Sequence, residues 1–301
     1  MVRYLGADVG GTNVRVGGMD ESGAVVFQRR VPTMENVSGG VDLIRKLDIL
    51  LRSVPGWEDA EAVGIGVPGA VSPATGCVTV ADNLTLLNGL PLAQTLEKSL
   101  GKPVRLENDA RVAALAEAID GAGKGKETVC YMTISTGLGG ATVHRGKLYR
   151  GSTNMGSYLC RMILDGGQNC ENLLSGTSLQ RRLSKKLGRP VASSAEVFTL
   201  AAAGNEDAAA LRETFIRNLS ELFLNLAITF NPDIIVAGGG VMQSAESFWE
   251  EATARFREIA HPQLEGILFA RALHEEPGLL GSCLLATQEK EQNALQQNPP
   301  H

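Results

Sequence analysis

The alternation of apolar and polar residues along the chain predicts a mixture of strands and helices. Apolar and β-branched residues bounded by glycines predict an opening meander of antiparallel strands at Tyr4–Val9, Val14–Met19 and Ala24–Val31. Apolar residues at helical spacing over Val41–Val54 predict a helix, and the short apolar run Ala62–Val67 is typical of a buried strand. The first third of the chain therefore combines a sheet with helices.

A second group of elements repeats this opening pattern. A short helix after Pro91 leads to a strand at Val104–Leu106, and an Ala-rich helix begins near Ala110. A strand at Val129–Ile134, a Gly-rich turn at Gly137–Gly140 and a further strand then repeat the opening meander. The repetition indicates a weak internal duplication.

Helices dominate the remainder of the chain. A long helix is predicted at Ala208–Phe230, followed by a strand at Ile234–Ala237, the glycines Gly238–Gly240 and a helix from Ala245. Residues 291–301 have no apolar periodicity, so we expect a disordered tail.

The length of the chain bounds its domain organisation. At 301 residues it exceeds the usual size of one domain, which predicts two lobes with a cleft between them. We place an N-terminal α/β lobe at 1–115 and a larger α/β lobe at 116–290, with the final helix packing back on the first lobe. Hydrophobic residues make up 44% and charged residues 20%, the balance of an ordinary globular protein.

Charge and cysteine content narrow the classes of partner. A net charge of -5 gives no general attraction to nucleic acid or to an anionic membrane, and neither is expected as a partner. Neither a signal peptide nor a membrane span is apparent, so we expect a cytoplasmic protein. The five cysteines have irregular spacings and form no CxxC pair, which indicates reduced thiols and no structural zinc site.

Two glycine-containing turns between predicted strands are candidate phosphate sites. In the segment Asp8–Asn13, the absent Cβ atoms of the glycines let backbone amides approach an anion closely. The segment Thr133–Gly140 adds hydroxyl groups to such amides, and two turns of this kind suit one triphosphate. Each turn also has a purely structural interpretation as a tight hairpin, and the Walker A pattern GxxxxGK[ST] is absent.

Two further segments carry candidate chemistry. Asp109 follows a predicted strand at the start of a helix, where a carboxylate either caps the helix or accepts the proton of an attacking hydroxyl. The neighbouring Asn108 offers a donor and an acceptor to hydroxyl groups. The run Pro232–Val241 passes from an apolar strand into three glycines, which suits the approach of adenine or ribose but is also common in α/β proteins.

Taken in order, these segments resemble the ROK family of sugar kinases and repressors in the actin-like ATPase superfamily. The matching stretches are DVGGT at Asp8–Thr12, GVPG at Gly66–Gly69, ENDA at Glu107–Ala110, STGLGG at Ser135–Gly140 and AGGGV at Ala237–Val241. The resemblance spans nearly the whole chain. It implies an α/β, two-lobed actin-like ATPase (ribonuclease H-like) fold with an interlobe cleft.

The resemblance also implies a reaction and a set of site residues. The reaction is transfer of the ATP γ-phosphoryl group to a hexose hydroxyl, usually the 6-OH, with Mg²⁺ bridging the phosphates and with a homodimer as the assembly. Asp109 becomes the catalytic base, and Asp8 lies in the metal–phosphate region. The phosphate contacts are Gly10, Gly11, Thr12, Thr136 and Gly137; the adenosine contacts are Gly239 and Gly240; and the sugar contacts are Asn83, Asn108 and Asp109.

The sequence departs from the family pattern where members show a GExGH segment and a CxCGxxGCxE zinc loop. Ser157 stands in place of the sugar-binding Glu, and Cys160 in place of the His. The loop that follows is shortened and supplies one cysteine, Cys170, where the family supplies three, so no zinc is expected. Glu171 aligns with the glutamate of that loop and is a candidate sugar contact. Which sugar is used is therefore open.

Two alternatives to a kinase follow from the same resemblance. Repressors of the family carry an added helix-turn-helix segment before the first motif, whereas here that motif begins at Asp8. The altered segment around Ser157 supports a catalytically degenerate sugar-binding or regulatory protein. Retention of Asp109 and of both glycine-containing turns favours the kinase.

Overall fold

The computed structural model describes residues 1–72, 75–81 and 84–288, so the predictions made for Asn83 and for residues 291–301 lie outside the described residues. The chain forms two compact units, each of which draws on separate stretches of sequence. Unit 1 comprises Met1–Ala116, Arg150–Met155 and the chain from Glu276 onward, and unit 2 comprises Glu117–Tyr149 and Gly156–Glu275. The last described helix therefore belongs to unit 1.

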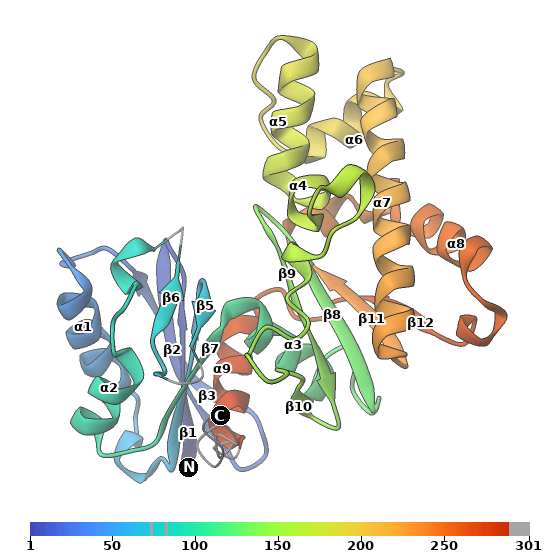
Figure 1. Cartoon of the computed structure of the whole chain (residues 1–301). Coiled ribbons are helices and arrows are strands. Elements are labelled where there is room, and N and C mark those ends of the chain that lie inside the picture. Colours follow the sequence, from blue (N-terminus) through green and yellow to red (C-terminus); the bar gives the residue numbers. More distant parts are fainter. Residues whose placement is uncertain (73–74, 82–83, 289–301) are drawn as a thin grey trace, which may run out of the picture. The chain divides into compact units, whose positions relative to one another are not determined.

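Unit 1 is built on a five-stranded mixed sheet (Figure 1). In spatial order its strands are β3 (Val25–Pro32), β2 (Asn13–Asp20), β1 (Val2–Val9), β4 (Ala62–Val67) and β7 (Val104–Asn108). The first three strands form the predicted antiparallel meander, while β4 and β7 run parallel to β1. A two-stranded sheet of β5 (Ala70–Val71) and β6 (Val78–Val80) follows β4.

Helices cover both faces of this sheet because successive strand residues point to opposite sides. On one face, α1 (Gly40–Arg52) and α2 (Leu92–Leu100) bury leucines against strand residues such as Leu5 and Ile65. On the other face lies α9 (Pro277–Thr287), which approaches the backbone closely. A Cβ atom at Gly6 would lie 2.5 Å from Cys283 Sγ, so glycine is required there.

Unit 2 repeats the same sheet order with different side chains. Its strands are β10 (Lys147–Leu148), β9 (Leu138–His144), β8 (Thr128–Ile134), β11 (Ile234–Gly238) and β12 (Leu268–Arg271). Again an antiparallel hairpin adjoins two strands that run parallel to its first strand. The topology thus contains the duplication that the sequence indicates weakly.

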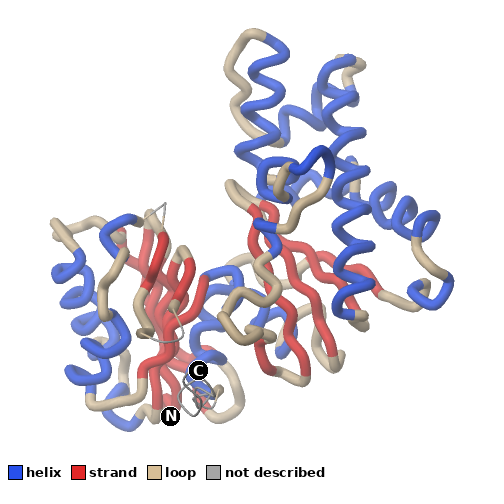
Figure 2. The backbone as a smooth tube through the Cα atoms, in the orientation of Figure 1, coloured by secondary structure: helices blue, strands red, loops and turns tan. Residues whose placement is uncertain are grey.

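The helices of unit 2 lie beside its sheet (Figure 2), and the two together form a large apolar core. They are α4 (Cys170–Leu174), α5 (Gly176–Leu187), α6 (Ala195–Ala202), α7 (Glu206–Phe230) and α8 (Trp249–Ile259). The core includes stacked and edge-to-face contacts among Phe198, Phe215 and Phe248. Helix α3 (Asp109–Ile119) begins in unit 1 and ends in unit 2.

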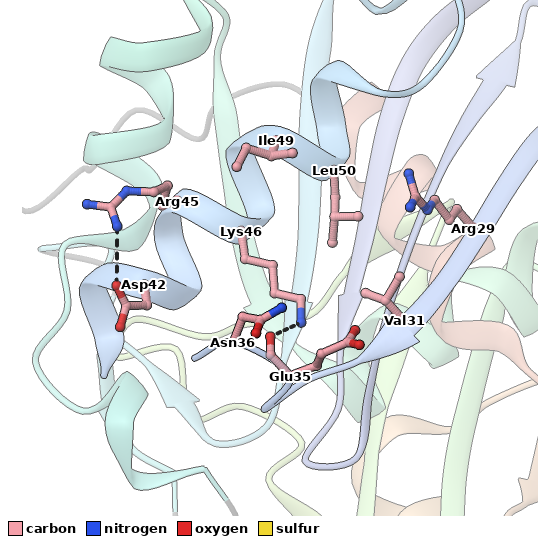
Figure 3. Close-up of a pocket in the computed structure, with 9 residues that line it drawn as sticks. All are labelled: Arg29, Val31, Glu35, Asn36, Asp42, Arg45, Lys46, Ile49 and Leu50. Carbon is pink, nitrogen blue, oxygen red and sulfur yellow. Dashed lines mark hydrogen bonds and ion pairs between the residues drawn. The ribbon is translucent and has the colours of Figure 1, made fainter. Parts of the chain in front are cut away.

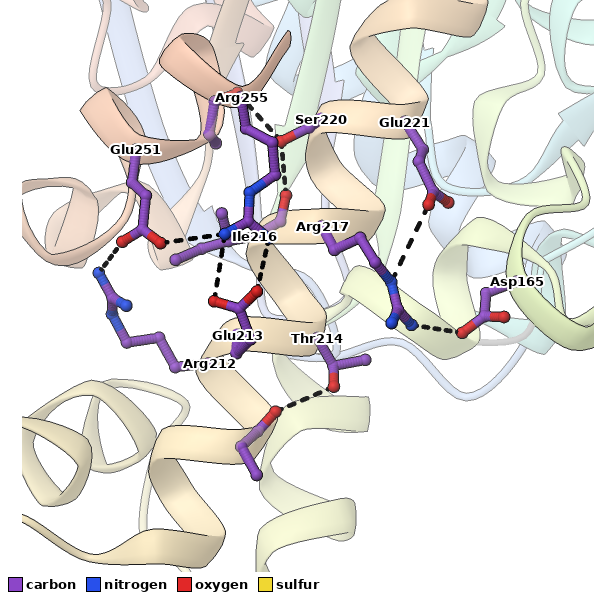
Figure 4. A network of polar contacts seen from close by, with 12 residues as sticks. Asp165, Arg212, Glu213, Thr214, Ile216, Arg217, Ser220, Glu221, Glu251 and Arg255 are labelled. Atoms are coloured by element: carbon purple, nitrogen blue, oxygen red, sulfur yellow. Dashed lines mark hydrogen bonds and ion pairs between the residues drawn. The ribbon is translucent and has the colours of Figure 1, made fainter. Parts of the chain in front are cut away.

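Ion pairs along α7 attach its neighbours at the surface (Figure 4). Arg255 of α8 pairs with Glu213 at 2.6 Å, and Arg217 of α7 pairs with Asp165 at 2.6 Å. These side chains are largely exposed, so each pair contributes about 0–1 kcal/mol to stability. The apolar core rather than this network stabilises unit 2.

The structure corrects two details of the sequence prediction. The predicted turn at Gly137–Gly140 is shorter, because Gly139 and Gly140 are paired within β9. Glycine at position 140 is needed there, since a Cβ atom would meet the carbonyl oxygen of Tyr131. The helix predicted from Ala245 begins at Trp249, after a 3₁₀ segment that starts at Gly240.

Short 3₁₀ segments connect several elements, at Trp57–Asp59, Thr85–Leu87, Leu159–Arg161, Asp165–Gly167, Gly240–Ser247 and Pro262–Leu264. Within residues 1–72, 75–81 and 84–288, every helix is too short or too polar to cross a membrane.

Candidate active site

Strand topology brings the predicted site residues of unit 1 to one edge of its sheet. Strands β1, β4 and β7 are parallel, so their carboxyl ends lie at the same edge. Asp8 is in register with Gly66, and Val67 with Asn108. Asp8 and Asp109 therefore lie close together, although a hundred residues separate them in the chain.

The turn between β1 and β2 is a compact hairpin loop. The amide of Gly10 donates to the carbonyl oxygen of Asn13 at 2.9 Å, and this bond closes the turn. A Cβ atom at position 10 would lie 3.1 Å from the same oxygen, which favours glycine. Gly11 and Thr12 at the tip are exposed and accessible to a ligand.

Asp8 is a buried carboxylate in a charged setting. Its cross-strand partner Arg15 donates from Nη1 to Asp8 Oδ2 at 3.0 Å and also pairs with Glu276. The first turn of α9 adjoins the carboxylate, because a Cβ atom at Gly278 would lie 2.5 Å from it. Burial raises the pKa of Asp8, and the hydrogen bond and charge of Arg15 oppose that rise.

Asp109 has an unusually high pKa for an aspartate. Desolvation by the surrounding protein raises its pKa to about 6, and the negative charge of Asp8 adds to the rise. One carboxylate oxygen accepts the amide of Ala110 at 2.8 Å, which is the capping role considered from the sequence. The residue as a whole is nevertheless exposed, so a ligand can reach it, although surrounding protein atoms desolvate its carboxylate.

Residues on both sides of Asp109 hold it in place. Asn108 accepts the Ala110 amide and donates to the carbonyl oxygen of Gly69, each at 3.0 Å. Its side chain also hydrogen-bonds to the Asp109 carboxylate, which lowers the pKa of Asp109, and one lone pair of Oδ1 remains for a ligand. Glu107 is 2% exposed and pairs with the equally buried Arg111 at 3.4 Å and with Arg150 at 2.9 Å.

In unit 2, the second predicted hairpin lies beside the predicted nucleotide glycines. Its turn is closed by the Ser135 amide, which donates to the carbonyl oxygen of Gly137 at 2.8 Å. The Gly176 amide at the start of α5 donates to Ser135 O at 2.7 Å. Gly239 (φ 92°) packs on the end of β8, where a Cβ atom would lie 2.5 Å from the carbonyl oxygen of Ile134. Only glycine combines this conformation with so close an approach.

Glu171 and two cysteines lie near this hairpin. The Glu171 carboxylate is beside Gly137, where a Cβ atom would be 2.7 Å from Glu171 Oε1. Burial, with a contribution from Glu171, raises the pKa of Cys160 to about 11. Burial, with a contribution from Cys160, raises the pKa of Cys170 to about 12. Both thiols are therefore protonated at neutral pH, and neither is poised as a nucleophile.

Ser157 has two features that lower the stability of the fold: a buried hydroxyl group without a hydrogen-bond partner in the described chain and a left-handed backbone conformation. It is 8% exposed, and its hydroxyl lacks a hydrogen-bond partner within the described part of the chain. Its φ of 58° is in the left-handed region, which is strained for a residue with a Cβ atom. Across the described residues, no group of three His, Cys, Asp or Glu side chains could hold a metal ion.

The sequence analysis did not identify Arg15 or Thr33. The position of Arg15 could have been predicted from the sequence, because a four-residue turn after Val9 pairs position 8 with position 15 across the hairpin. Thr33 is fully buried and bonds to the first hairpin from 23 residues away, and no local sequence pattern indicates that contact.

Comparison with known proteins places these features in a family. The chain is 29% identical to a glucokinase of Thermotoga maritima over 94% of this chain and 96% of that protein. It superposes on a ROK hexokinase from Thermus thermophilus with a TM-score of 0.84 at 33% identity, covering 94% of this chain and 97% of the other. A ROK glucokinase from Streptomyces griseus, solved with glucose and AMPPNP, has a TM-score of 0.73 at 26% identity and coverage of 95% and 99%.

These similarities confirm the resemblance inferred from the motifs and the actin-like α/β fold that it implies. The ROK family model matches residues 4–289, which is nearly the whole chain. The protein therefore belongs to the ROK family.

Proposed function

We propose that this protein is an ATP-dependent sugar kinase that transfers the γ-phosphoryl group to a hydroxyl, the 6-OH, of a hexose or hexose derivative. The observation that carries the proposal is an open carboxylate with a pKa of about 6 at the carboxyl edge of the sheet, in the same unit as a glycine hairpin. A base of this pKa is largely ionised at neutral pH and still basic enough to accept a hydroxyl proton. The sugar kinases named above, which match nearly the full chain, support the same reaction.

In the proposed reaction, the oxygen of the sugar hydroxyl attacks the γ-phosphorus while Asp109 accepts the hydroxyl proton. ADP is the leaving group. The exposed tip at Gly11 and Thr12 and the hairpin at Thr136 and Gly137 bind phosphate oxygens through backbone amides and hydroxyls. Such preorganised donors stabilise the charge of the transferring group.

The nucleotide and its metal fit the residues present. Gly239 and Gly240 are the proposed adenosine contacts. A Cβ atom at Gly240 would meet only Ser135 Oγ, at 3.6 Å, so the backbone there is open to a ligand, whereas Gly239 lets the turn pack on the end of β8. Asp8 would hold hydrated Mg²⁺, since Arg15 engages only one oxygen of its carboxylate. When bound, Mg²⁺ neutralises phosphate charge and aligns the γ-phosphoryl group.

The sugar contacts that we propose are Asn83, Asn108, Ser157, Cys160 and Glu171, together with the base. Ser157 replaces a charged, longer side chain, and its hydroxyl is buried without a partner in the described chain. Loss of a charged hydrogen bond costs about 1.5–3 kcal/mol, which is enough to change sugar preference without abolishing turnover. The shorter side chain leaves either a gap filled by water or room for a bulkier or differently oriented substrate, so which hexose is used stays open.

The experiment is a panel of hexoses, hexosamines and ketoses with Mg-ATP, in which ADP release and ligand-induced thermal stabilisation are both recorded. The kinase proposal expects ADP release with at least one sugar, and no release with the 6-deoxy form of that sugar. Asp109→Asn should lose most turnover while remaining folded. Asp59→Asn, an exposed carboxylate of the same unit, should retain it.

A degenerate sugar-binding or regulatory protein of the same family is the second candidate. The altered positions Ser157 and Cys160 favour it. This alternative expects thermal stabilisation by a sugar without ADP release across the whole panel. Equal turnover of the Asp109→Asn variant would remove the proposed base and with it the mechanism.

A further inference from the structure

Thr33 connects the end of β3 to the first hairpin through two hydrogen bonds. Its hydroxyl donates to the carbonyl oxygen of Gly10 at 2.6 Å, and its amide donates to the carbonyl oxygen of Thr12 at 2.8 Å. The residue is fully buried, so neither bond competes with water. One residue therefore holds two of the peptide groups that form the turn.

The direction of these two carbonyls fixes the direction of two amides. In a planar trans peptide the C=O and the following N–H point to opposite sides, and the described chain has no cis peptide bond. Because Thr33 holds the Gly10 carbonyl inward, the Gly11 amide points away from Thr33. The Thr12 carbonyl directs the Asn13 amide in the same way. The turn thus presents N–H groups on the side opposite Thr33.

Lys46 of α1 donates hydrogen bonds to the segment that contains Thr33. Its ammonium group donates to the carbonyl oxygens of Pro32 and Glu35, each at 2.7 Å, and to that of Thr33 at 3.4 Å. Figure 3 shows Lys46 extending from α1 towards Glu35 in a pocket of about 270 Å³. Three carbonyls on one cation hold residues 32–35 in a single conformation, since an ammonium group offers three donors.

We propose that Thr33, supported by Lys46, is a positioning residue that orients the Gly11 and Asn13 amides towards the phosphates of the nucleotide. This inference rests on the proposed function, because it takes the hairpin to be a phosphate site. Preorganised amides cost no reorganisation when charge develops on the phosphate. Without the Thr33 hydroxyl the turn keeps its closing Gly10–Asn13 bond and the bond from the Thr33 amide to Thr12 O, but it loses the restraint on the peptide plane between Gly10 and Gly11.

The test compares Thr33→Val, which removes the hydroxyl and preserves the shape, with Thr33→Ser, which retains the hydroxyl. Thr95→Val is the matched control, because it removes a hydroxyl–carbonyl bond elsewhere in unit 1. We measure KM for Mg-ATP and for the sugar, and Kd for ATP, ADP, AMP and adenosine by calorimetry. Lys46→Met is a second variant at a partly exposed position, which keeps the test valid if Thr33→Val fails to fold.

For Thr33→Val we expect KM for Mg-ATP and Kd for ATP and ADP to rise by roughly tenfold, with adenosine affinity and sugar KM unchanged. Thr33→Ser should restore most of the affinity, Lys46→Met should show a smaller loss in the same direction, and the control should match wild type. A general loss of stability would weaken the binding of all four ligands alike, whatever their number of phosphates. Unchanged ADP affinity in Thr33→Val, or in Lys46→Met if the former does not fold, overturns the proposal.

Failure of this inference is distinguishable from failure of the proposed function. Wild-type turnover with normal nucleotide affinity in the Thr33 variants refutes the positioning role and leaves the kinase standing. If the wild-type protein binds ADP but turns over no sugar, the kinase proposal is refuted. The Kd values for ATP, ADP, AMP and adenosine still test the role of Thr33 in that case.

Discussion

The pH dependence of turnover follows from the pKa of Asp109 and tests the site directly. If Asp109 must be ionised to accept the hydroxyl proton, kcat/KM rises with pH through about 6 and is level above pH 7. With this pKa, about 90% of the base is ionised at pH 7 and about 9% at pH 5, so activity falls roughly tenfold between them. An ordinary aspartate with a pKa of about 3.9 would remain more than about 90% ionised at pH 5.

The assay is the initial rate of ADP formation between about pH 5 and 8.5, with sugar and Mg-ATP well below their KM values and with constant ionic strength. Stability of the protein at each pH is checked by preincubation and return to neutral pH. Asp8→Asn removes the charge that raises the pKa of Asp109, so the midpoint of the residual activity should move to lower pH. It should stay above the ordinary aspartate value, because burial is the larger cause. A wild-type midpoint near pH 4, or a flat profile, refutes Asp109 as the base.

The same pKa predicts an opposite effect on stability. Since the folded-state pKa of Asp109 exceeds the unfolded value, its contribution to stability is full below about pH 4 and is lost as pH rises through about 6. Replacement by neutral Asn should therefore raise Tm at pH 7–8 and change it little near pH 4. A variant that is less active and less stable at every pH would indicate a structural defect instead.

Other positions give independent tests. Gly278→Ala places a Cβ atom against the Asp8 carboxylate, so we expect a lower Tm by calorimetry and weaker activation by Mg-ATP; wild-type values would contradict the close approach. Glu107→Ala leaves the buried Arg111 guanidinium without its carboxylate and should lower the free energy of unfolding in urea by about 3–5 kcal/mol. A change below about 1 kcal/mol would show that the pair is dispensable. Ser157→Ala removes a hydroxyl without a partner in the described chain, so Tm should hold or rise while sugar KM changes and ATP KM does not; an unchanged sugar KM would exclude a sugar contact.

The elements around the site were predictable where local pattern decides them. The hairpin strands follow from β-branched residues bounded by glycines, and a four-residue turn after Val9 fixes Asp8 opposite Arg15. A bond from the Asp109 carboxylate to the start of the helix was also foreseeable, and Oδ1 accepts the Ala110 amide; the role of Asp109 as a base stays a prediction. Local sequence sufficed because these contacts join neighbours in the chain.

Contacts between distant segments were not predictable in the same way. Gly6 within a strand signals a close approach, but its neighbour Cys283 lies at the far end of the sequence. Thr33 lies in a polar stretch typical of a loop, and full burial of its side chain depends on the packing of α1 and the first hairpin. The left-handed conformation of Ser157 likewise depends on tertiary structure, because serine has no intrinsic preference for it.

The duplicated topology explains why each unit gathers its candidate chemistry at one place. In both units a hairpin turn leaves the carboxyl end of its first strand, and the parallel neighbours of that strand end at the same edge. A carboxylate that follows a parallel strand, such as Asp109, or glycines that follow one, such as Gly239, must therefore lie near the turn. The shape of the sheet sets this proximity, so the side chains can differ between the proposed base of one unit and the proposed nucleotide contacts of the other. Substitutions that alter sugar preference should accordingly fall in segments outside the two sheets, as Ser157 does.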